Sequence, residues 1–235
     1  MQPSIGYETL AKLSVGQPVD RLTYLSEACR GRSVLDVGCF DETALAKRDT
    51  EHWLHGRIVE LASRVVGVDS SSQIPDEGLQ TGLNASIVRG DGVNIDPKLI
   101  TREKFDVIVA GEFIEHIDNP LLFFTTMKLN FPGRTLLIST PNGACFANTL
   151  MGLIGREVQH PDHLHNFSFK ILHTLCRRAG LESWEVIPYR FYATEMILAS
   201  TGVKRVFVIL VERSIRLVER LFPLLSFGYI VRAKL

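Results

Sequence analysis

The sequence predicts an α/β fold built on a doubly wound, mostly parallel sheet, and two patterns support this prediction. Short apolar runs rich in β-branched residues alternate along the chain with longer helical segments, as in parallel strands joined by crossover helices. These runs are continuous rather than alternating in polarity, which is typical of strands that helices cover on both faces. We expect the first five strands at 33–38, 64–69, 85–89, 105–110 and 135–139.

Helices are expected before, between and after these strands. The segment 7–30 is expected to form one or two helices that stop at Gly31. Two more strands are expected at 184–192 and 227–234, and the segment 203–222 between them has an apolar and a basic side, as in an amphipathic helix. The remaining helices are expected at 42–63, 71–80, 97–103, 119–129 and 168–179.

Length and composition indicate an ordinary globular chain. The 235 residues are 46% hydrophobic and 22% charged, and no linker-like stretch interrupts them, so a single domain is expected. The chain has 26 basic and 26 acidic residues, and a zero net charge argues against a dedicated nucleic-acid binder. The longest strongly apolar run, 206–211, is far shorter than the ~20 residues that span a bilayer. The segment 1–13 lacks a signal-peptide pattern and the four cysteines form no CxxC pair, so we expect reduced thiols and a cytoplasmic location.

Acidic residues and glycines follow the predicted strands at their carboxyl ends, where ligands bind in parallel sheets. The chain has no P-loop motif, and the turn after the first strand has Gly38 but no GxGxxG series. A rim of carboxylates instead suits a cationic ligand that carries ribose hydroxyls. Asp69 is placed to accept hydrogen bonds from both ribose hydroxyls, and Asp91 is placed to accept one from an adenine amino group.

Five motifs in order resemble those of the class I S-adenosylmethionine-dependent methyltransferases. They are VLDVGCFDE, VVGVDSS, VRGDG, FDVIVAGEFIEHIDNP and LLISTPNG, and the likeness covers about 33–181. This resemblance implies a Rossmann-like fold with a seven-stranded sheet whose last strand is antiparallel. It also implies one methyltransferase domain over 1–235, with an N-terminal helical lid at 1–32, a cofactor-binding core at 33–181 and C-terminal strands with an inserted helix at 182–235.

The resemblance also implies roles for individual residues. Gly38 would form the turn under the methionine part of S-adenosylmethionine, Asp36 would support that turn or reach the cofactor's amino group, and Glu112 would line the methyl-donor side. The chain departs from the family at Phe40 and Glu42, where glycines are usual, and a non-catalytic relative is therefore one alternative. The full expected cofactor-binding set is Asp36, Gly38, Cys39, Phe40, Asp69, Ser70, Asp91, Gly92, Gly111 and Glu112.

Carboxylates and histidines gather in two segments beyond these motifs. Glu112, Glu115 and His116 would share one face of a helical turn, where they could hold a divalent cation or orient a general base. The segment 160–168 contains His160, His163 and His165, of which His163 has the strongest case for function. We expect His163, His116 and Glu115 to be catalytic, and Glu112, Glu115, His116 and His163 to be the candidate ligands of Mg²⁺.

Structural roles remain open for the same residues. Glu115 and His116 could anchor the turn, His160 and His165 could be solvated, and Trp53 and His55 are expected to pack a helix rather than touch a ligand. The helix 203–222 could carry a solvated face, a homodimer contact or a membrane-surface contact.

Hydroxyl chemistry is favoured because a hydroxyl acceptor must lose its proton during transfer. The segment STPNG followed by HPDHLHNFS resembles ubiquinone-biosynthesis-like and polysaccharide-modifying methyltransferases. We therefore expect O-methylation of a small molecule or saccharide. An enzyme like the small-RNA 2′-O-methyltransferases is the alternative. The zero net charge of the chain argues against a nucleic-acid partner.

Overall fold

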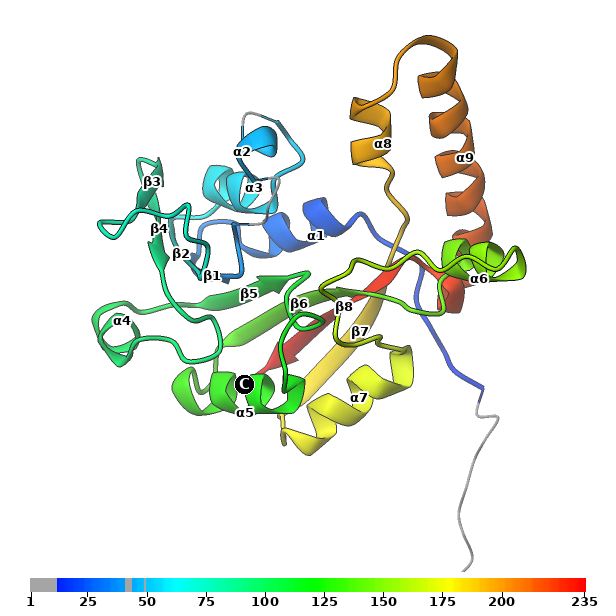
Figure 1. Cartoon of the computed structure of the whole chain (residues 1–235). Coiled ribbons are helices and arrows are strands. Elements are labelled where there is room, and N and C mark those ends of the chain that lie inside the picture. Colours follow the sequence, from blue (N-terminus) through cyan, green and yellow to red (C-terminus); the bar gives the residue numbers. More distant parts are fainter. Residues whose placement is uncertain (1–11, 41–43, 49) are drawn as a thin grey trace, which may run out of the picture.

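The computed structural model describes residues 12–40, 44–48 and 50–235. All eight strands of this described part form one sheet, in the order β3-β4-β2-β1-β5-β6-β8-β7 (Figure 1). The strands are β1 (Ser33–Val37), β2 (Arg64–Asp69), β3 (Leu79–Gly82), β4 (Ala85–Arg89), β5 (Val107–Gly111), β6 (Thr135–Pro141), β7 (Ser183–Tyr189) and β8 (Gly228–Lys234).

The sheet is mostly parallel, as predicted, and the expected Rossmann-like arrangement is confirmed. Strands β4, β2, β1, β5 and β6 pair in parallel, whereas β8 is antiparallel to both β6 and β7. The expected count of seven strands is wrong by one. The additional strand, β3, pairs antiparallel with β4 at the edge of the sheet and lies partly in the segment 71–80, which was predicted to be helical. Pro75 and Gly78, whose φ is +87°, end any helix there.

Helices cover both faces of the sheet (Figure 1). They are α1 (Arg21–Ala28), α2 (Ala44–Lys47), α3 (Leu54–Leu61), α4 (Pro97–Arg102), α5 (Pro120–Asn130), α6 (Phe146–Leu153), α7 (Phe169–Arg178), α8 (Thr194–Leu198) and α9 (Gly202–Leu221), and a 3₁₀ turn follows at Pro223–Leu225. Side-chain caps begin several of them. Asp20 accepts from the Thr23 N–H at α1, and Asn119 accepts from the Leu122 N–H at α5, where Pro120 takes the first helical position.

Two predicted helices are shorter than expected. In the segment 7–30 only α1 is helical among the described residues, and residues 7–11 lie outside them. Val19 instead pairs with Tyr189 in an isolated parallel bridge, and Pro18 disfavours a helical conformation in the preceding residue, Gln17. Within the segment 1–32, for which a helical lid is expected, the described residues contain the helix α1. The segment 42–63 contains α2 and α3 with turns between them, and the Trp53 indole N–H is tied to the Cys39 carbonyl oxygen at 3.1 Å.

Successive residues of the central strands pack alternately into two apolar layers, one on each face of the sheet. Val107 and Val109 of β5 pack with α1 and α3, whereas Ile108 and Ala110 pack with α5 and α7 on the other face. This explains why the strand sequences are apolar without interruption. The four cysteines are buried and reduced in the structure. The described residues contain no helix that is both long enough and apolar enough to span a membrane.

Candidate active site

A cavity of about 80 Å³ opens at the carboxyl ends of β1 and β5. Its lining carries two acids, Asp36 and Glu112, and two permanently basic residues, Arg21 and Lys47. Ligand pockets usually measure about 300–1,000 Å³, so this cavity must widen to hold a nucleoside-sized molecule. The remaining lining residues are Gly38, Cys39, His52, Trp53, Leu54, His55 and Gly111.

The turn after β1 requires glycine at position 38. Gly38 has φ +66°, its N–H donates to the Val68 carbonyl oxygen at 2.9 Å, and a Cβ atom there would lie 2.4 Å from the Phe113 ring. A Cβ on Gly92, after β4, would lie 2.9 Å from the same ring. Phe113 therefore fills the space between these two turns. Phe113 was not predicted from the sequence. The glycines at the two turns, Gly38 and Gly92, were the one sequence feature that indicated a bulky side chain packed between them.

Asp36 supports the turn through a buried hydrogen-bond chain. One carboxylate oxygen of Asp36 lies 2.8 Å from Nδ1 of His55, and Nε2 of His55 lies 2.9 Å from the Thr81 hydroxyl. His55 and Trp53 are buried, which agrees with the packing role expected for them, although both also line the cavity. The supporting role proposed for Asp36 is the one that these contacts favour.

Asp69 ties the ends of β1 and β2 together. One carboxylate oxygen accepts from the Phe40 N–H at 2.9 Å, and the other accepts from the Ser71 N–H at 2.9 Å. Phe40 is buried against Trp53 and Ile74, so it fills space where the family usually has a glycine. Glu42, the other departure from the family pattern, lies outside the described residues.

Asp91 and Ser70, two further residues of the expected cofactor-binding set, are exposed. Asp91 accepts hydrogen bonds from the Val93 N–H at 2.7 Å and from the Asn94 side chain at 2.8 Å, so its carboxylate closes its own turn. Ser70 is exposed beside Asp69.

Glu112 lies in a strained turn after β5. Its φ of +54° is the only positive value for a non-glycine residue in the described chain, and such strain concentrates at functional sites. The Glu112 N–H donates to the Ser139 carbonyl oxygen at 3.0 Å. Its carboxylate accepts from the Tyr189 hydroxyl at 3.0 Å and lies 3.6 Å from the Arg21 guanidinium.

Arg21 approaches Glu112 from the start of α1. Its guanidinium donates to the Ser139 hydroxyl at 3.2 Å and lies 5.3 Å from the centre of the Tyr192 ring. The Glu112 carboxylate is thus held by side chains from α1 and β7. Sequence reasoning did not identify Arg21, Tyr189 or Tyr192, because no local motif links them to the turn.

Glu115 is fully buried and points to β6. One carboxylate oxygen accepts from the Thr140 hydroxyl at 3.0 Å. Burial and the neighbouring Glu112 carboxylate raise the pKa of Glu115 well above its usual value. Its other oxygen and Nε2 of His165 are buried without a hydrogen-bond partner among the described residues. Such orphaned polar atoms at a turn beside a cavity are unusual and fit a site that receives a ligand.

Three histidines meet at the rim of this turn. The His116 and His163 ring centres are 4.6 Å apart, and the His160 ring lies 5.4 Å from His163 and 5.9 Å from His116. We call these residues the histidine cluster. Burial and the proximity of His116 and His160 lower the pKa of His163, so that its ring is neutral at neutral pH.

The expected shared face of Glu112, Glu115 and His116 does not form. Residues 112–119 are turns rather than a helix, because the positive φ of Glu112 changes the direction of the chain. As a result, Glu112 points to Tyr189, Glu115 points to Thr140, and His116 points to His163. Of the four candidate metal ligands, the structure brings together His116 and His163, and it adds His160.

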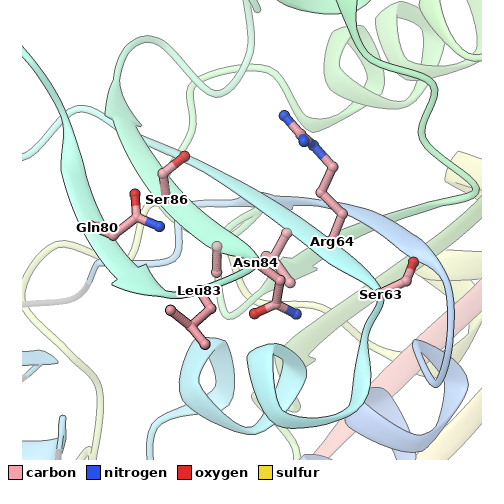
Figure 2. A pocket seen from close by; sticks show the side chains of 8 residues that line it. Ser63, Arg64, Gln80, Leu83, Asn84 and Ser86 are labelled. Atoms are coloured by element: carbon pink, nitrogen blue, oxygen red, sulfur yellow. The ribbon is translucent and has the colours of Figure 1, made fainter.

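A second cavity, of about 290 Å³, lies beside β2, β3 and β4, away from the first cavity (Figure 2). It is lined by Arg64 and Val65 at the start of β2, Ala85 and Ser86 at the start of β4, and Gln80 of β3. Because it opens at the amino ends of the parallel strands, it is opposite to the edge at which ligands bind in this type of fold.

Comparisons with known proteins assign the family. A family model described as a methyltransferase domain matches residues 11–186, and the chain therefore belongs to the methyltransferase domain family. The matched segment is a class I S-adenosylmethionine-dependent methyltransferase domain. A crystal structure of such an enzyme from Archaeoglobus fulgidus superposes with a TM-score of 0.54 over 92% of this chain and 91% of that one, at 17% identity. At this identity the likeness concerns the fold.

Two curated relatives share a more specific name. The ubiquinone biosynthesis O-methyltransferase of Agrobacterium fabrum is 30% identical over 128 residues, which are 51% of this chain and 45% of that protein. The enzyme of the same name from Haemophilus ducreyi is 27% identical over 175 residues, which are 68% of this chain and 70% of that protein. The chain therefore spans less than half the length of the first of these relatives.

The residues present fit S-adenosylmethionine as the methyl donor. Gly38 lines the cavity with a φ of +66°, a conformation that glycine adopts readily and that suits a turn lying close to a ligand. A Cβ atom on Gly111 would lie 2.6 Å from Leu54, so the cavity floor also depends on a glycine. Asp36 and Glu112 place two carboxylates in the cavity lining, and Asp69 ends the neighbouring strand β2. Carboxylates suit a donor with ribose hydroxyls and positive charge.

Proposed function

We propose that the chain methylates a hydroxyl group on a small molecule or saccharide. When bound, S-adenosylmethionine supplies a methyl group that is already activated, so the protein has to align the acceptor and remove its proton. The observation that carries the proposal is the histidine cluster, in which His160 and His163 meet His116 on the turn that starts at the cavity residue Glu112. The names of the two curated relatives support an oxygen acceptor.

Asp69 is the residue that we assign to the ribose, and Asp91 with Gly92 borders the adenine in this proposal. The Asp69 carboxylate accepts the N–H groups of Phe40 and Ser71, which hold it at the end of β2 beside the turn that follows β1. Asp36 and Gly38, with Cys39 and Phe40 after them, form the turn beneath the methionine part. Gly111 and Glu112 complete the donor side.

The acceptor side is assigned to the histidine cluster and Glu115. A neutral imidazole can take the proton of a hydroxyl directly, and a metal ion held by imidazoles can lower the pKa of that hydroxyl. The lowered pKa of His163 favours the neutral imidazole, which is the form needed both to accept a proton and to bind a metal ion. Glu115 is buried, its pKa is raised by burial and by the Glu112 carboxylate, and one of its oxygens accepts from the Thr140 hydroxyl, so we assign it to positioning the turn.

The test separates donor binding from turnover. Purified protein is titrated with S-adenosylmethionine by calorimetry and then assayed with catechols, saccharides and a short RNA as acceptors. We expect His163→Ala to lose at least about tenfold in turnover on a hydroxylated small molecule while donor affinity stays near wild type. His173→Gln, at a histidine on α7 outside the cavity lining, is the matched control.

Three results would contradict the proposal. Loss of donor binding in His163→Ala would place this residue on the donor side instead. Methylation confined to the RNA would favour the nucleic-acid alternative. Donor binding without turnover on any of the acceptors would favour a non-catalytic relative.

A further inference from the structure

We propose that His116, His160 and His163 form a binding site for a transition-metal ion such as Zn²⁺. The ligand nitrogens that these three residues can offer all lie within 4.8 Å of one another. Two of them come from the segment 160–163, and the third comes from the turn after β5. This proposal deepens the proposed function at the acceptor side, but metal binding can be measured without any turnover.

The donor atoms select the type of metal. Three imidazoles suit Zn²⁺, Co²⁺, Ni²⁺ or Cu²⁺, whereas Mg²⁺ prefers carboxylate and water oxygens. The carboxylates that would favour Mg²⁺ have other partners than the histidines, since Glu112 contacts Tyr189 and Arg21, and one Glu115 oxygen contacts Thr140. The metal type expected from the structure thus differs from the Mg²⁺ expected from the sequence spacing.

The backbone already holds the two segments in place. The N–H groups of Leu164 and His165 both donate to the Glu115 carbonyl oxygen, at 2.8 and 3.2 Å. The His163 N–H donates to the His160 carbonyl oxygen at 3.1 Å, which closes a tight turn between these two ligands. Zn–N bonds are about 2.0–2.1 Å long, so the rings need only small rotations to converge on one ion.

Such a site has a clear chemical use. Three protein ligands on a tetrahedral ion leave the fourth position for water or for an acceptor oxygen, as in catalytic rather than structural zinc sites. His116 and His160 are exposed and His163 is half-buried, so the ion would be reachable from solvent. It would also fasten the segment 160–163 to the turn that carries Glu112.

The experiment is a Co²⁺ titration of metal-free protein, followed by visible absorption and calorimetry. We expect one ion per chain, and we expect His160→Ala and His163→Ala each to weaken binding by at least about tenfold. Zn²⁺ should displace Co²⁺, and an excess of Mg²⁺ should not. His173→Gln should bind Co²⁺ as the wild type does.

The outcomes separate this site from its alternatives. Unchanged Co²⁺ affinity in both His160→Ala and His163→Ala would overturn the proposal. Displacement by Mg²⁺ together with loss of binding in Glu112→Gln would also overturn it, in favour of the carboxylate set. Circular dichroism of each variant confirms that the fold is kept. Because none of these readouts involves methyl transfer, failure here leaves the proposed function standing.

A different observation supports a second inference, on the outer face of α9. Helices α8 and α9 form a hairpin that projects from the sheet (Figure 1). The side of α9 that faces the protein contains Val208, Glu212 and Glu219, which are buried. The opposite side is apolar and exposed, with Phe207 at 64% exposure and Leu210 at 55%. The other exposed apolar residues of this outer face are Val203, Val206, Leu217 and Leu221.

The charges on α9 are separated in the same way. Both acids are buried, and each accepts a backbone N–H, from Ala193 to Glu212 and from Phe191 to Glu219. Every exposed charged side chain of α9 is a cation, namely Lys204, Arg205, Arg213 and Arg220. An apolar stripe flanked only by positive charge is typical of helices that lie in the interface of an anionic membrane.

We infer that α9 binds an anionic lipid surface, and we favour this occupant over a second copy of the chain because of the uniform positive charge. Two copies packed through this face would bring the cations of both helices together, whereas acidic headgroups would neutralise them. The base of the hairpin lies near the cavity, since Lys47 lines the cavity and pairs with Glu195 of α8 at 3.1 Å.

Co-sedimentation with lipid vesicles tests this inference. We expect binding to vesicles in which about a third of the lipid is phosphatidylglycerol, and little binding to pure phosphatidylcholine. Phe207→Ser should weaken binding strongly, and Arg213→Gln with Arg220→Gln should weaken it by roughly fivefold per charge. Leu129→Gln, at an apolar residue of α5 that is even more exposed than Phe207, is the matched control.

The homodimer is the contrary outcome. If the chain sediments as a dimer that Phe207→Ser disperses, and neither vesicle type is bound, the face is a contact between copies. Equal binding to both vesicle types would overturn the role of the cations. Equal loss of binding in Leu129→Gln and Phe207→Ser would show that α9 is not the site.

Discussion

The Tyr189 hydroxyl donates a hydrogen bond of 3.0 Å to the Glu112 carboxylate, which joins the end of β7 to the turn after β5. Tyr189 is fully buried, and the pKa of its hydroxyl is raised well above the usual value by burial and by the Glu112 carboxylate. The hydroxyl therefore stays protonated and acts as a donor. It helps to hold Glu112 in a backbone conformation that a glutamate rarely adopts.

Removing this donor should weaken the fold. In Tyr189→Phe, the Glu112 carboxylate loses a buried hydrogen bond, and we expect the free energy of unfolding to fall by about 1–2 kcal/mol. Urea denaturation measures the change. Tyr192→Phe is the control, because the structure records an aromatic contact but no Tyr192–Glu112 hydrogen bond in the described residues. Equal stability of wild type and Tyr189→Phe would show that the bond contributes nothing.

Because Glu112 has a positive φ, we expect a glycine substitution at this position to be more stable than an alanine substitution, which is the reverse of the usual order. At an ordinary position, glycine is less stable than alanine because it loses more backbone entropy. At φ +54° alanine is strained and glycine is not, so Glu112→Gly should be more stable than Glu112→Ala by about 1 kcal/mol. Both variants lack the carboxylate, so thermal unfolding of the pair isolates the backbone. A more stable alanine variant would contradict the strain at this turn.

Much of the fold was predictable because the amino-acid composition of the central strands reflects their burial on both faces. Val107 to Gly111 has helices on both faces, so each of its apolar residues is buried and the run is easy to recognise. The edge strand β3 was not recognised, since Leu79–Gly82 is polar, short and only partly buried. Its pairing with β4 depends on the turn at 83–84 between the two strands, and helical periodicity does not reveal such a turn.

The candidate site was predictable only where the residues follow a strand. Gly38 and Glu112 come directly after a parallel strand and Asp69 is the last residue of one, so topology alone brings them to the same edge. The direction of a side chain in the turn could not be predicted, because it depends on the φ of Glu112 and on partners distant in the sequence. Arg21 and Tyr189 are such partners, and local sequence contains no information about their pairing with Glu112.

Gly38 should tolerate no side chain. A Cβ atom would lie 2.4 Å from the Phe113 ring at a residue with φ +66°, so Gly38→Ala should lose about 2 kcal/mol or more of stability. Calorimetry should also show weaker binding of S-adenosylmethionine. Phe113→Leu in the same chain removes the clash but not the backbone strain, so it should restore part of the stability. No recovery in the double variant would mean that Phe113 does not limit this turn.

Asp69 can be tested with two variants that separate the loop from the ligand. Asp69→Asn keeps one oxygen that can accept a backbone N–H, whereas Asp69→Ala leaves the N–H groups of Phe40 and Ser71 without this acceptor. We expect both to weaken S-adenosylmethionine binding by about tenfold or more, and only the alanine variant to lose stability markedly. Asp91→Asn should have a smaller effect on the donor. Unchanged calorimetric affinity in both Asp69 variants would refute the ribose assignment.

Glu219 gives the chain a pH-dependent stability that is separate from the active site. Burial raises the pKa of this carboxyl to about 7 from 4.5, although it accepts the Phe191 N–H at 2.8 Å. The folded state thus binds a proton more tightly than the unfolded state, so the contribution of Glu219 is fully present below pH 4.5 and is lost as the pH rises through 7. Glu219→Gln should flatten the stability profile in this window by about 2 kcal/mol relative to wild type, since glutamine does not titrate. Urea denaturation at a series of pH values measures both profiles, with Glu182→Gln as the control, and parallel profiles of Glu219→Gln and wild type would show that Glu219 does not titrate in this window.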